Sequence, residues 1–475
     1  MKKILLISGL LFILASCTKH LSELNIDSKN PVVVPSETLF SNAQLNLAND
    51  LATPNVNVNI WRMIAQHWTE TTYTDESNYD LSTRPIPQTW WHTMYRDVLK
   101  NFEEAKKLIA TDVTDANIKK NELAIAEILE VFSYHYIVTT FGDIPYSEAL
   151  DFNKVQPKFD DAKTVYDALI ARLDAAISNL NTSAESFGSA DLLYGGDVAA
   201  WKKFANSIKL KMGILIADSD PAKSKTMIEA AYTGAFTSNN DNAAFQFLAA
   251  PPNTNPVWVN LVQSGRKDFV AANTLVNVMK GLNDPRIPLY FTVNAASGYS
   301  GGIYGASNSY ATFSKPSLTI QEPEFPYTFM DYSEVEFILA EAAARGMSVG
   351  GTAEFHYNKA ITASIIDWGG TNADALLYLA QPSVAYTTAT GTYKQKIGMQ
   401  KWIALYEHGH DAWTDWRRLD YPQLVKPASA LSDIPVRYFY PVSEQNLNGA
   451  NVAAAVAKLS GGQDVVTVKL WFDKF

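Results

Sequence analysis

Cysteine is nearly absent from this chain of 475 residues, histidine occurs only seven times, and acidic side chains outnumber basic ones. The single cysteine, Cys17, excludes an intramolecular disulfide and any site that needs several thiolates. No two histidines have the HExxH spacing of a zinc hydrolase, and no GxSxG, Walker or GxGxxG pattern lies in a strand-turn-helix setting. The net charge of −10 repels phosphate backbones. The sequence therefore predicts no metal, no cofactor and no nucleic-acid partner.

Long hydrophobic runs are also missing beyond the first residues. Lys2 and Lys3 precede an apolar run over residues 4–14, about 11 residues long, whereas a membrane-spanning helix needs about 20. The run leads into Leu-Ala-Ser-Cys at positions 14–17, which is the pattern of a lipoprotein processing site. We therefore expect residues 1–16 to be a signal peptide. Cys17 is then expected to carry the acyl chains that anchor the mature protein to a membrane.

The segment after the predicted anchor is polar and rich in residues that break regular structure. We expect residues 17–34 to form a flexible tether, and the packed body to occupy residues 35–475. Loss of Lys2 and Lys3 with the signal peptide makes the net charge of the mature chain two units more negative than −10.

Helical periodicity dominates the body up to about residue 233. Apolar side chains recur at spacings of three and four residues over 60–68, 91–109, 166–180 and 201–215. From residue 234 to about residue 330 the chain becomes rich in Asn, Pro, Gly, Ser and Tyr, with one short helical run at 273–282. Such composition is typical of ordered loops that carry sites on a rigid scaffold. We therefore predict a mainly all-α fold with long irregular loop insertions.

Helices are expected to resume after this insertion. Ser333 and Glu336 match a capping box, in which Ser333 caps the Glu336 amide and Glu336 reaches back, and Gly346 is predicted to end the helix. In the next helix Tyr357 lies between alanines at 353 and 360, the spacing of the second helix of a tetratricopeptide unit. One helix pair cannot bury its apolar faces alone, so the sequence predicts a tetratricopeptide-like helical repeat scaffold.

Two polar clusters offer metal-ligand atoms. Residues 408–411, His-Gly-His-Asp, combine two imidazoles with an acid, but the rest of a metallohydrolase motif is missing, so a solvated turn at a helix end is favoured. Residues 239–242, Asn-Asn-Asp-Asn, offer oxygen ligands of the type that calcium needs without the spacing of an EF-hand. An Asx-rich turn is the favoured interpretation there.

Aromatic residues outside the helical stripes are the most informative candidates for ligand contact. Sugar rings expose apolar C–H faces that stack on Trp and Tyr, while amides, carboxylates and Arg bind the hydroxyls. Packing against the scaffold is the alternative for each of them, and Trp258 could hold the insertion onto the helices. The predicted ligand-binding set is Tyr73, Asp75, Asn78 and Tyr79 in a first loop, and Trp258, Gln263, Arg266, Asp268, Tyr304, Asn308 and Tyr310 in the insertion.

Six segments resemble blocks of the SusD/RagB family, and specifically its SusD-like subgroup, in the order in which the family has them. The first segment is similar to the family signature FGDVPYSEAL. In the fourth segment, residues 407–411 differ from the Gln-Gly-Glu type of sequence that is more usual in the family. With the lipoprotein site, the segments span essentially the whole chain. They are TTFGDIPYSEAL at 139–150, LNDPRIPLYF at 282–291, YSEVEFILAEAAARG at 332–346, QKWIALYEHGHDAWTDWRRLDYP at 400–422, IPVRYFYPVSEQNLN at 434–448 and VKLWFDK at 468–474.

The resemblance implies a function as well as a fold. Members are α-helical lipoproteins on a tetratricopeptide-like scaffold that sit as a lid on a SusC-type TonB-dependent transporter of the outer membrane. They bind glycans, or in some cases peptides, and pass them on without cleavage. We therefore expect a nutrient-binding protein and not an enzyme, held to the outer membrane through Cys17 and facing the cell exterior.

Three alternatives stay open at this point. A surface hydrolase would need paired carboxylates, whose separation in space is invisible in a sequence. A structural lid would serve the transporter with little ligand affinity of its own. A lipoprotein facing the periplasm would share the anchor but not the location.

Overall fold

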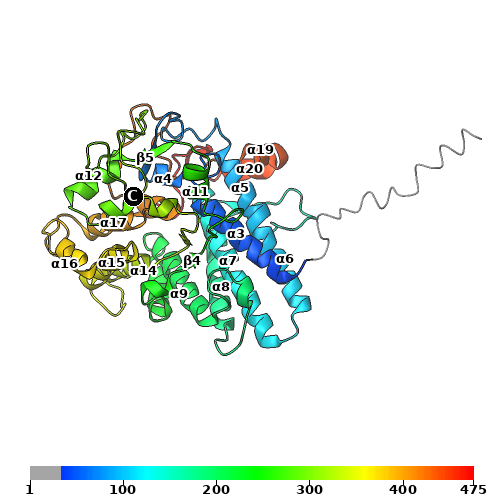
Figure 1. Ribbon diagram of the computed structural model, residues 1–475. Helices are drawn as coiled ribbons and strands as arrows, with labels where there is room; N and C mark the ends of the chain where they lie inside the picture. Colours follow the sequence, from blue (N-terminus) through cyan, green and yellow to red (C-terminus); the bar gives the residue numbers. More distant parts are fainter. Residues whose placement is uncertain (1–33) are drawn as a thin grey trace, which may run out of the picture.

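The computed structural model describes residues 34–475, so the predicted signal peptide, Cys17 and nearly all of the predicted tether lie outside the described residues. The N-terminal part is a layer of long helices packed side by side, α3 on α6, α6 on α7, α7 on α8 and α8 on α9 (Figure 1). These helices and their companions are α3 (Ser36–Ala52), α5 (Ile86–His92), the π-helix η1 (Thr93–Leu99), α6 (Lys100–Asp112), α7 (Ala116–Phe141), α8 (Ala162–Asn179), α9 (Val198–Leu215) and α10 (Pro221–Ala231).

Aspartates define where four of these helices begin, and one of them, Asp220, accepts the Lys223 amide at the start of α10. The side chains of Asp115, Asp161 and Asp197 accept hydrogen bonds from the free backbone amides at the starts of α7, α8 and α9. Helix α7 is 26 residues long and is buried around most of its circumference, because α6, α8 and α9 cover it. It ends at Gly142, whose φ of 92° suits a residue without a Cβ. The family-like segment at 139–150 thus forms the exit from the central helix.

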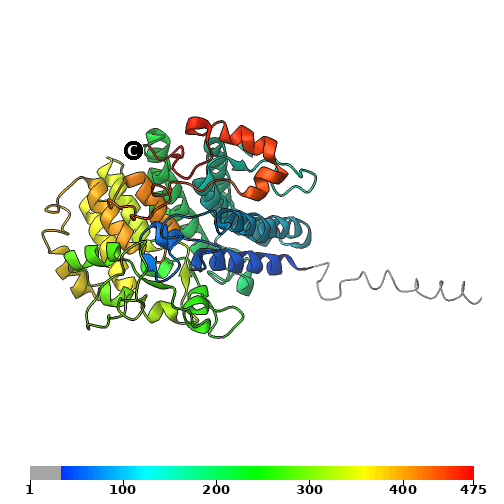
Figure 2. The same cartoon turned by 90° about the horizontal axis from the view of Figure 1, so that it is seen from above.

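The C-terminal helices pack against this layer through α9. Helix α14 contacts α9, α15 and α17, and Figure 2 shows the yellow to light orange helices of residues 332–404 at the side of the molecule away from α3, whereas α20 contacts strand β3 (Phe159–Asp160). As predicted, Tyr357 and Ala360 of α15 are buried at the junction with α14, and Gly346, with a φ of 80°, follows the end of α14. The elements are α14 (Tyr332–Ala344), α15 (Ala353–Asp367), α16 (Asn372–Leu379), α17 (Tyr393–Ala404), α18 (Gly409–Leu419), α19 (Val442–Leu447) and α20 (Gly449–Val456).

The cap of α14 differs from the predicted capping box. Asp331 is the N-cap, and its carboxylate accepts the Glu334 amide at 2.6 Å. Ser333 instead donates its hydroxyl to the Ala360 carbonyl of α15 at 2.9 Å, and Glu336 pairs with His356 at 2.6 Å. The helix begins two residues earlier than expected because aspartate offers a charged acceptor, and Ser333 then serves the contact between the two helices.

The insertion contains more short elements than the single run that was predicted. Within residues 34–475 the strands form three two-stranded sheets, which pair β1 with β5, β2 with β3, and β4 with β6. The short elements outside the long helices are α4 (Trp61–Ile64), β1 (Trp68–Glu70), β2 (Ile144–Pro145), β3 (Phe159–Asp160), β4 (Ala244–Phe245), α11 (Pro256–Trp258), the π-helix η5 (Val259–Gln263), β5 (Phe269–Ala271), α12 (Asn273–Gly281), α13 (Ile287–Tyr290), β6 (Tyr327–Thr328), and the 3₁₀ turns η2 (Gly188–Ala190), η3 (Tyr232–Gly234), η4 (Asn239–Asp241), η6 (Thr319–Gln321) and η7 (Ser460–Gly462).

The helix predicted over residues 60–68 is wrong beyond its first turn. Only Trp61–Ile64 are α-helical, Gln66 has a φ of 57°, and the chain then turns into strand β1. The left-handed backbone at Gln66 is incompatible with a continuing helix. The antiparallel partner β5 lies about 200 residues away, as the pairing of Trp68 with Ala271 shows, so the local apolar spacing could not reveal it.

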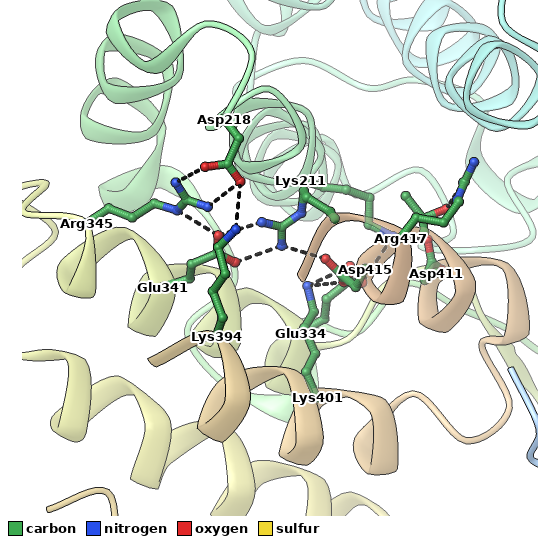
Figure 3. A network of polar contacts seen from close by, with 12 residues as sticks. Lys211, Asp218, Glu334, Glu341, Arg345, Lys394, Lys401, Asp411, Asp415 and Arg417 are labelled. Carbon is green, nitrogen blue, oxygen red and sulfur yellow. Dashed lines mark hydrogen bonds and ion pairs between the residues drawn. The ribbon is translucent and has the colours of Figure 1, made fainter. Parts of the chain in front are cut away.

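A network of buried ion pairs joins α9 to α14, α17 and α18 (Figure 3). The Lys211 ammonium lies 3.1 Å from the Glu334 carboxylate and 2.9 Å from that of Asp411. Lys401 lies 2.5 Å from Asp415 in the same network. Because a buried charge is stable only when it is paired, these contacts fix how the late helices dock on the early layer. Among residues 34–475, no helix combines the length and the apolar character needed to cross a membrane.

Candidate functional site

Pairing of β1 with β5 brings the two predicted ligand loops together. The strands are antiparallel, with Glu70 opposite Phe269, and the Thr71 amide continues the ladder to the Asp268 carbonyl at 2.8 Å. The Thr71 carbonyl accepts the Asn308 amide at 2.8 Å, which adds the loop around residue 308. Three segments distant in sequence, near residues 71–84, 263–269 and 303–310, therefore form one surface. We call this surface the loop patch.

The exposed members of the predicted set lie on the loop patch. The Tyr73 side chain is 63% exposed, and Tyr73, Arg266 and Asp268 line the same shallow depression, with the Arg266 guanidinium bonded to the Asp268 carboxylate. Asp75 and Gln263 are exposed on the adjoining loops. The depression measures only about 20 Å³, so a ligand would lie across an open surface and not inside a pocket.

Two lysines flank the half-buried ring of Tyr310. The ammonium of Lys267 is 5.8 Å and that of Lys315 is 5.1 Å from the ring centroid. Neither lysine belongs to the predicted set, and nothing in their local sequence pointed to them. Backbone bonds from Thr71 to Asp268 and from Asn308 to Thr71 hold the segments of Lys267 and Tyr310 next to each other. The loop patch thus combines tyrosine rings with charged hydrogen-bonding groups of both signs.

Four other predicted residues are buried beneath the loop patch, where their side chains hold it together. The Asn78 amide donates to the Gly305 carbonyl at 2.8 Å, and the Tyr304 hydroxyl donates to the Met63 carbonyl at 2.7 Å. Asn308 donates to the Glu70 carbonyl at 2.9 Å, and the Tyr79 hydroxyl accepts from Gln66 at 3.2 Å. Trp258 is half-buried at the end of α11. The structure thus separates the predicted set into an exposed group and a supporting group.

A buried carboxyl lies under the loop patch. Ser77 donates both its amide, at 2.9 Å, and its hydroxyl, at 2.8 Å, to Glu70. Burial, followed by the hydrogen bond with Glu76 and the charge of Glu76, raises the pKa of Glu70 to about 9. The neighbouring Glu76 is paired with Arg84. At neutral pH Glu70 therefore keeps its proton.

We expect the stability of the protein to fall as the pH rises through the neutral range, because the folded chain retains a proton on Glu70 that the unfolded chain releases above about pH 4.5. Because the pKa of Glu70 is raised, the contribution of this carboxyl to the free energy of unfolding is fully present below about pH 4.5. It is lost as the pH approaches about 9. The free energy of unfolding of the wild type should fall by ~1.4 kcal/mol between pH 6.5 and pH 7.5. Glu70→Gln mimics the protonated acid and should remove this pH dependence. Urea unfolding at both pH values measures it. Glu322→Gln, at an exposed carboxyl, should behave like the wild type.

The predicted solvated turn at residues 408–411 is wrong, because His408, His410 and Asp411 are only 8%, 3% and 4% exposed. Packing of α18 onto α4 and α17 buries this segment, which a sequence pattern does not reveal. Glu334, His408 and Asp411 offer ligand atoms within 4.8 Å of one another. The Lys211 ammonium already lies between the two carboxylates, and burial raises the pKa of Glu334 to about 7. The geometry favours an internal ion pair over a metal site.

The Asx-rich turn predicted at residues 239–242 is present as the 3₁₀ turn η4. Ser238 and Asp241 form a capping box, and Asp241 also accepts from the Lys203 ammonium at 2.7 Å. The GxSxG letters at Gly346–Gly350 stand in the loop after helix α14, where Ser348 is exposed and no strand precedes it. They therefore do not form a nucleophile elbow.

Two larger cavities lie away from the loop patch. One, of about 460 Å³, is lined mainly by apolar side chains, among them Trp91, Tyr95 and Phe152. The other, of about 540 Å³, lies between α12 and residues 421–424. Neither is lined by a residue of the predicted set.

Comparisons with known proteins agree with this architecture. A chitin-binding protein of known structure is 26% identical with a TM-score of 0.81, and the match covers 93% of this chain and 100% of that one. A chitin-binding SusD homologue from Flavobacterium johnsoniae is 26% identical with a TM-score of 0.78, over 92% and 97% of the two chains. A SusD homologue from Bacteroides uniformis is 26% identical with a TM-score of 0.79, over 92% and 99%.

None of the curated proteins compared matches the sequence. The family model SusD-like_2, described as starch-binding and associating with the outer membrane, matches residues 28–441. That match and the shared helical fold confirm the resemblance drawn from the six segments. The chain therefore belongs to the SusD-like family of starch-binding, outer-membrane-associated proteins.

Proposed function

We propose that this protein binds glycan chains at the cell surface on the loop patch and delivers them to a SusC-type TonB-dependent transporter. The joining of three loop segments by β1 and β5 into one exposed surface is the observation that carries this proposal. Tyr73 and Tyr310 offer ring faces for sugar C–H groups, and Arg266 and Asp268 offer donors and acceptors for hydroxyls.

The open shape of the loop patch favours a long chain over a small molecule. A glycan can lie across the surface and contact Tyr73 and Tyr310 with different sugar units, so its affinity should grow with chain length. The relatives named as chitin-binding support a polysaccharide as the first ligand to test. Starch is the second ligand to test, because the family is described as starch-binding.

Loss of the tyrosine rings should weaken glycan binding. We expect Tyr73→Ala and Tyr310→Ala each to raise the dissociation constant about 5- to 30-fold, since covering one ring face contributes about 1–2 kcal/mol. Affinity electrophoresis and calorimetry with chitin and starch oligosaccharides measure this. Phe355→Ala removes an exposed ring on α15, outside the loop patch, and should leave binding unchanged. Unchanged affinity in the double variant Tyr73→Ala, Tyr310→Ala would disprove the role of the loop patch.

The proposed role as a binding companion has two further checks. A reducing-sugar assay should detect no product, whereas a hydrolase would release new chain ends. When outer membranes are solubilised in mild detergent, purification of this protein should also recover a barrel transporter. Co-purification without affinity for any glycan or peptide would point to a purely structural lid.

A further inference from the structure

A third cavity lies between the insertion and the helical body, apart from the loop patch. Its volume is about 390 Å³, and no residue of the predicted ligand set lines it. Its wall combines the end of α3, helix α4, turn η4, strands β4 and β6, the end of α15 and the segment before α18. This volume is within the ~300–1,000 Å³ that small-molecule sites occupy.

Three residues of the cavity wall carry buried polar atoms without partners among the described residues. Glu407 is only 6% exposed, its Oε2 pairs with Arg62 at 2.8 Å, and its Oε1 has no partner among the described residues. His408 is 8% exposed, and its Nδ1 likewise has none. The buried Oδ1 of Asn239 is a third such atom. Buried polar atoms are normally satisfied, so this wall has hydrogen-bonding capacity that no described residue uses.

Most of the hydrogen-bonding capacity of this cavity is for accepting. Asp331 and Asp367 line it together with Glu407, and Asn242 donates to Asp367 at 3.0 Å. Asp367 lies at the accessible rim, yet protein atoms crowd its carboxyl. This desolvation, with the Asp331 charge, raises the pKa of Asp367 to about 7. Such a wall suits a ligand rich in O–H or N–H donors and repels anions.

Aromatic rings form another part of the wall. Trp368 and Phe325 both line the cavity, with ring centroids 6.2 Å apart at 38°. Tyr290 packs against Trp368 at 4.6 Å and holds its indole in place. A ring face beside several acceptors matches a pyranose, which has an apolar C–H face and hydroxyls at its edge. A lone metal ion would use neither the rings nor most of the volume.

We propose that this cavity is a second ligand site that takes one or two pyranose rings, with the sugar donors on Glu407, Asn239 and the two aspartates and a ring face on Trp368. A cavity of about 390 Å³ has room for one or two sugar rings, so it accepts a chain end or a free small sugar. The site is separate from the loop patch and does not depend on the proposed function of that surface.

A neutral sugar and an amino sugar share this donor-rich chemistry, and pH distinguishes them. The charged and titratable groups of the cavity wall are Arg62, Tyr327, Asp331, Asp367, Glu407 and His408. An ammonium group should bind more tightly as Asp367 ionises, so its affinity should rise between pH 6 and pH 7, before the amine loses its own proton, and Asp367→Asn should abolish that rise. Affinity for a neutral sugar should change little over the same range.

The test fills the cavity from two sides and titrates sugars into the full chain. Asn240 and Thr319 line the cavity with exposed side chains, so Asn240→Trp and Thr319→Trp can block it with little effect on folding. Ligand-observed NMR and calorimetry use glucose, N-acetylglucosamine, glucosamine and the dimers of each. We expect the wild type to bind at least one of them, and each blocking variant to bind it at least 10-fold more weakly.

Two controls separate this site from the loop patch. Asn372→Trp, at an exposed asparagine of α16 outside the cavity, should bind small sugars like the wild type. Tyr73→Ala with Tyr310→Ala should lose polymer binding and keep small-sugar binding. The proposal is overturned if the wild type binds none of the six sugars, or if both blocking variants fold, by thermal unfolding, and bind as tightly as the wild type.

Discussion

Asp284→Ala is expected to destabilise the protein by about 3–5 kcal/mol, because it leaves the Arg286 guanidinium buried without a counter-charge. Both side chains are 0% exposed, and their closest N–O distance is 2.6 Å. Burial works to lower the pKa of Arg286, but the nearby Asp284 charge outweighs it and keeps that pKa above its usual value. The arginine therefore stays charged and must find another partner.

The remaining partners of Arg286 cannot replace the carboxylate. Ser364 accepts at 2.9 Å and Gln400 at 3.1 Å, and both are neutral. These bonds also join the segment at 282–291 to α15 and α17, so their disturbance should spread into the C-terminal helices. Urea unfolding at pH 7, compared with the wild type, gives the loss directly.

The matched control is Asp433→Ala. Asp433 also lies in an ion pair, with Lys426 at 2.5 Å, but its side chain is 74% exposed. Surface pairs contribute about 0–1 kcal/mol, so this variant should unfold almost like the wild type. Equal stability losses in the two variants would contradict the role given to burial. Asp284→Asn should fall between them, since it keeps hydrogen bonds and loses the charge.

Cys17→Ala is expected to remove the protein from the outer membrane. This residue lies outside the described part of the chain, and the expectation rests on the lipoprotein pattern at positions 14–17. Each buried methylene of an acyl chain contributes about 0.8 kcal/mol, and stable anchoring takes about two chains, so loss of the only acylated residue should abolish the attachment. Fractionation of the native host and mass spectrometry of the mature N-terminus measure the change.

Ser28→Ala, in the predicted tether, is the control and should leave the protein in the outer membrane. Retention of the Cys17→Ala variant there, or an unmodified Cys17 in the mature wild type, would refute the anchor. Protease added to whole cells then tests orientation. A protein that faces the exterior should be cleaved, and one that faces the periplasm should be protected.

The helices that the sequence predicted best are those with one apolar face. Helices α8 and α15 and the first half of α9 show three- and four-residue spacing because one side of each meets the core and the other meets water. Helix α7 showed no such stripe, because its neighbours bury nearly every face, and only the segment that ends it was recognised. Complete burial removes the contrast on which periodicity depends.

Membership of the candidate site was easier to predict than the orientation of its residues. The aromatic and polar loops were identified, but Tyr79 and Tyr304 point inward while Tyr73 points outward. That difference is set by the pairing of residues 68–70 with 269–271, which no local pattern encodes. The buried segment at 408–411 was misjudged for the same reason, because its burial comes from helices far away in sequence.

The backbone ladder beneath the loop patch has a consequence for how ligand preference can change. Main-chain bonds from Thr71 to Asp268 and from Asn308 to Thr71 hold the loops in place, and main-chain bonds do not depend on side-chain identity. Exposed positions such as Tyr73 and Gln263 can therefore be exchanged without loosening the frame beneath them. Under the proposed function, the same scaffold can therefore change its carbohydrate specificity through a few surface substitutions.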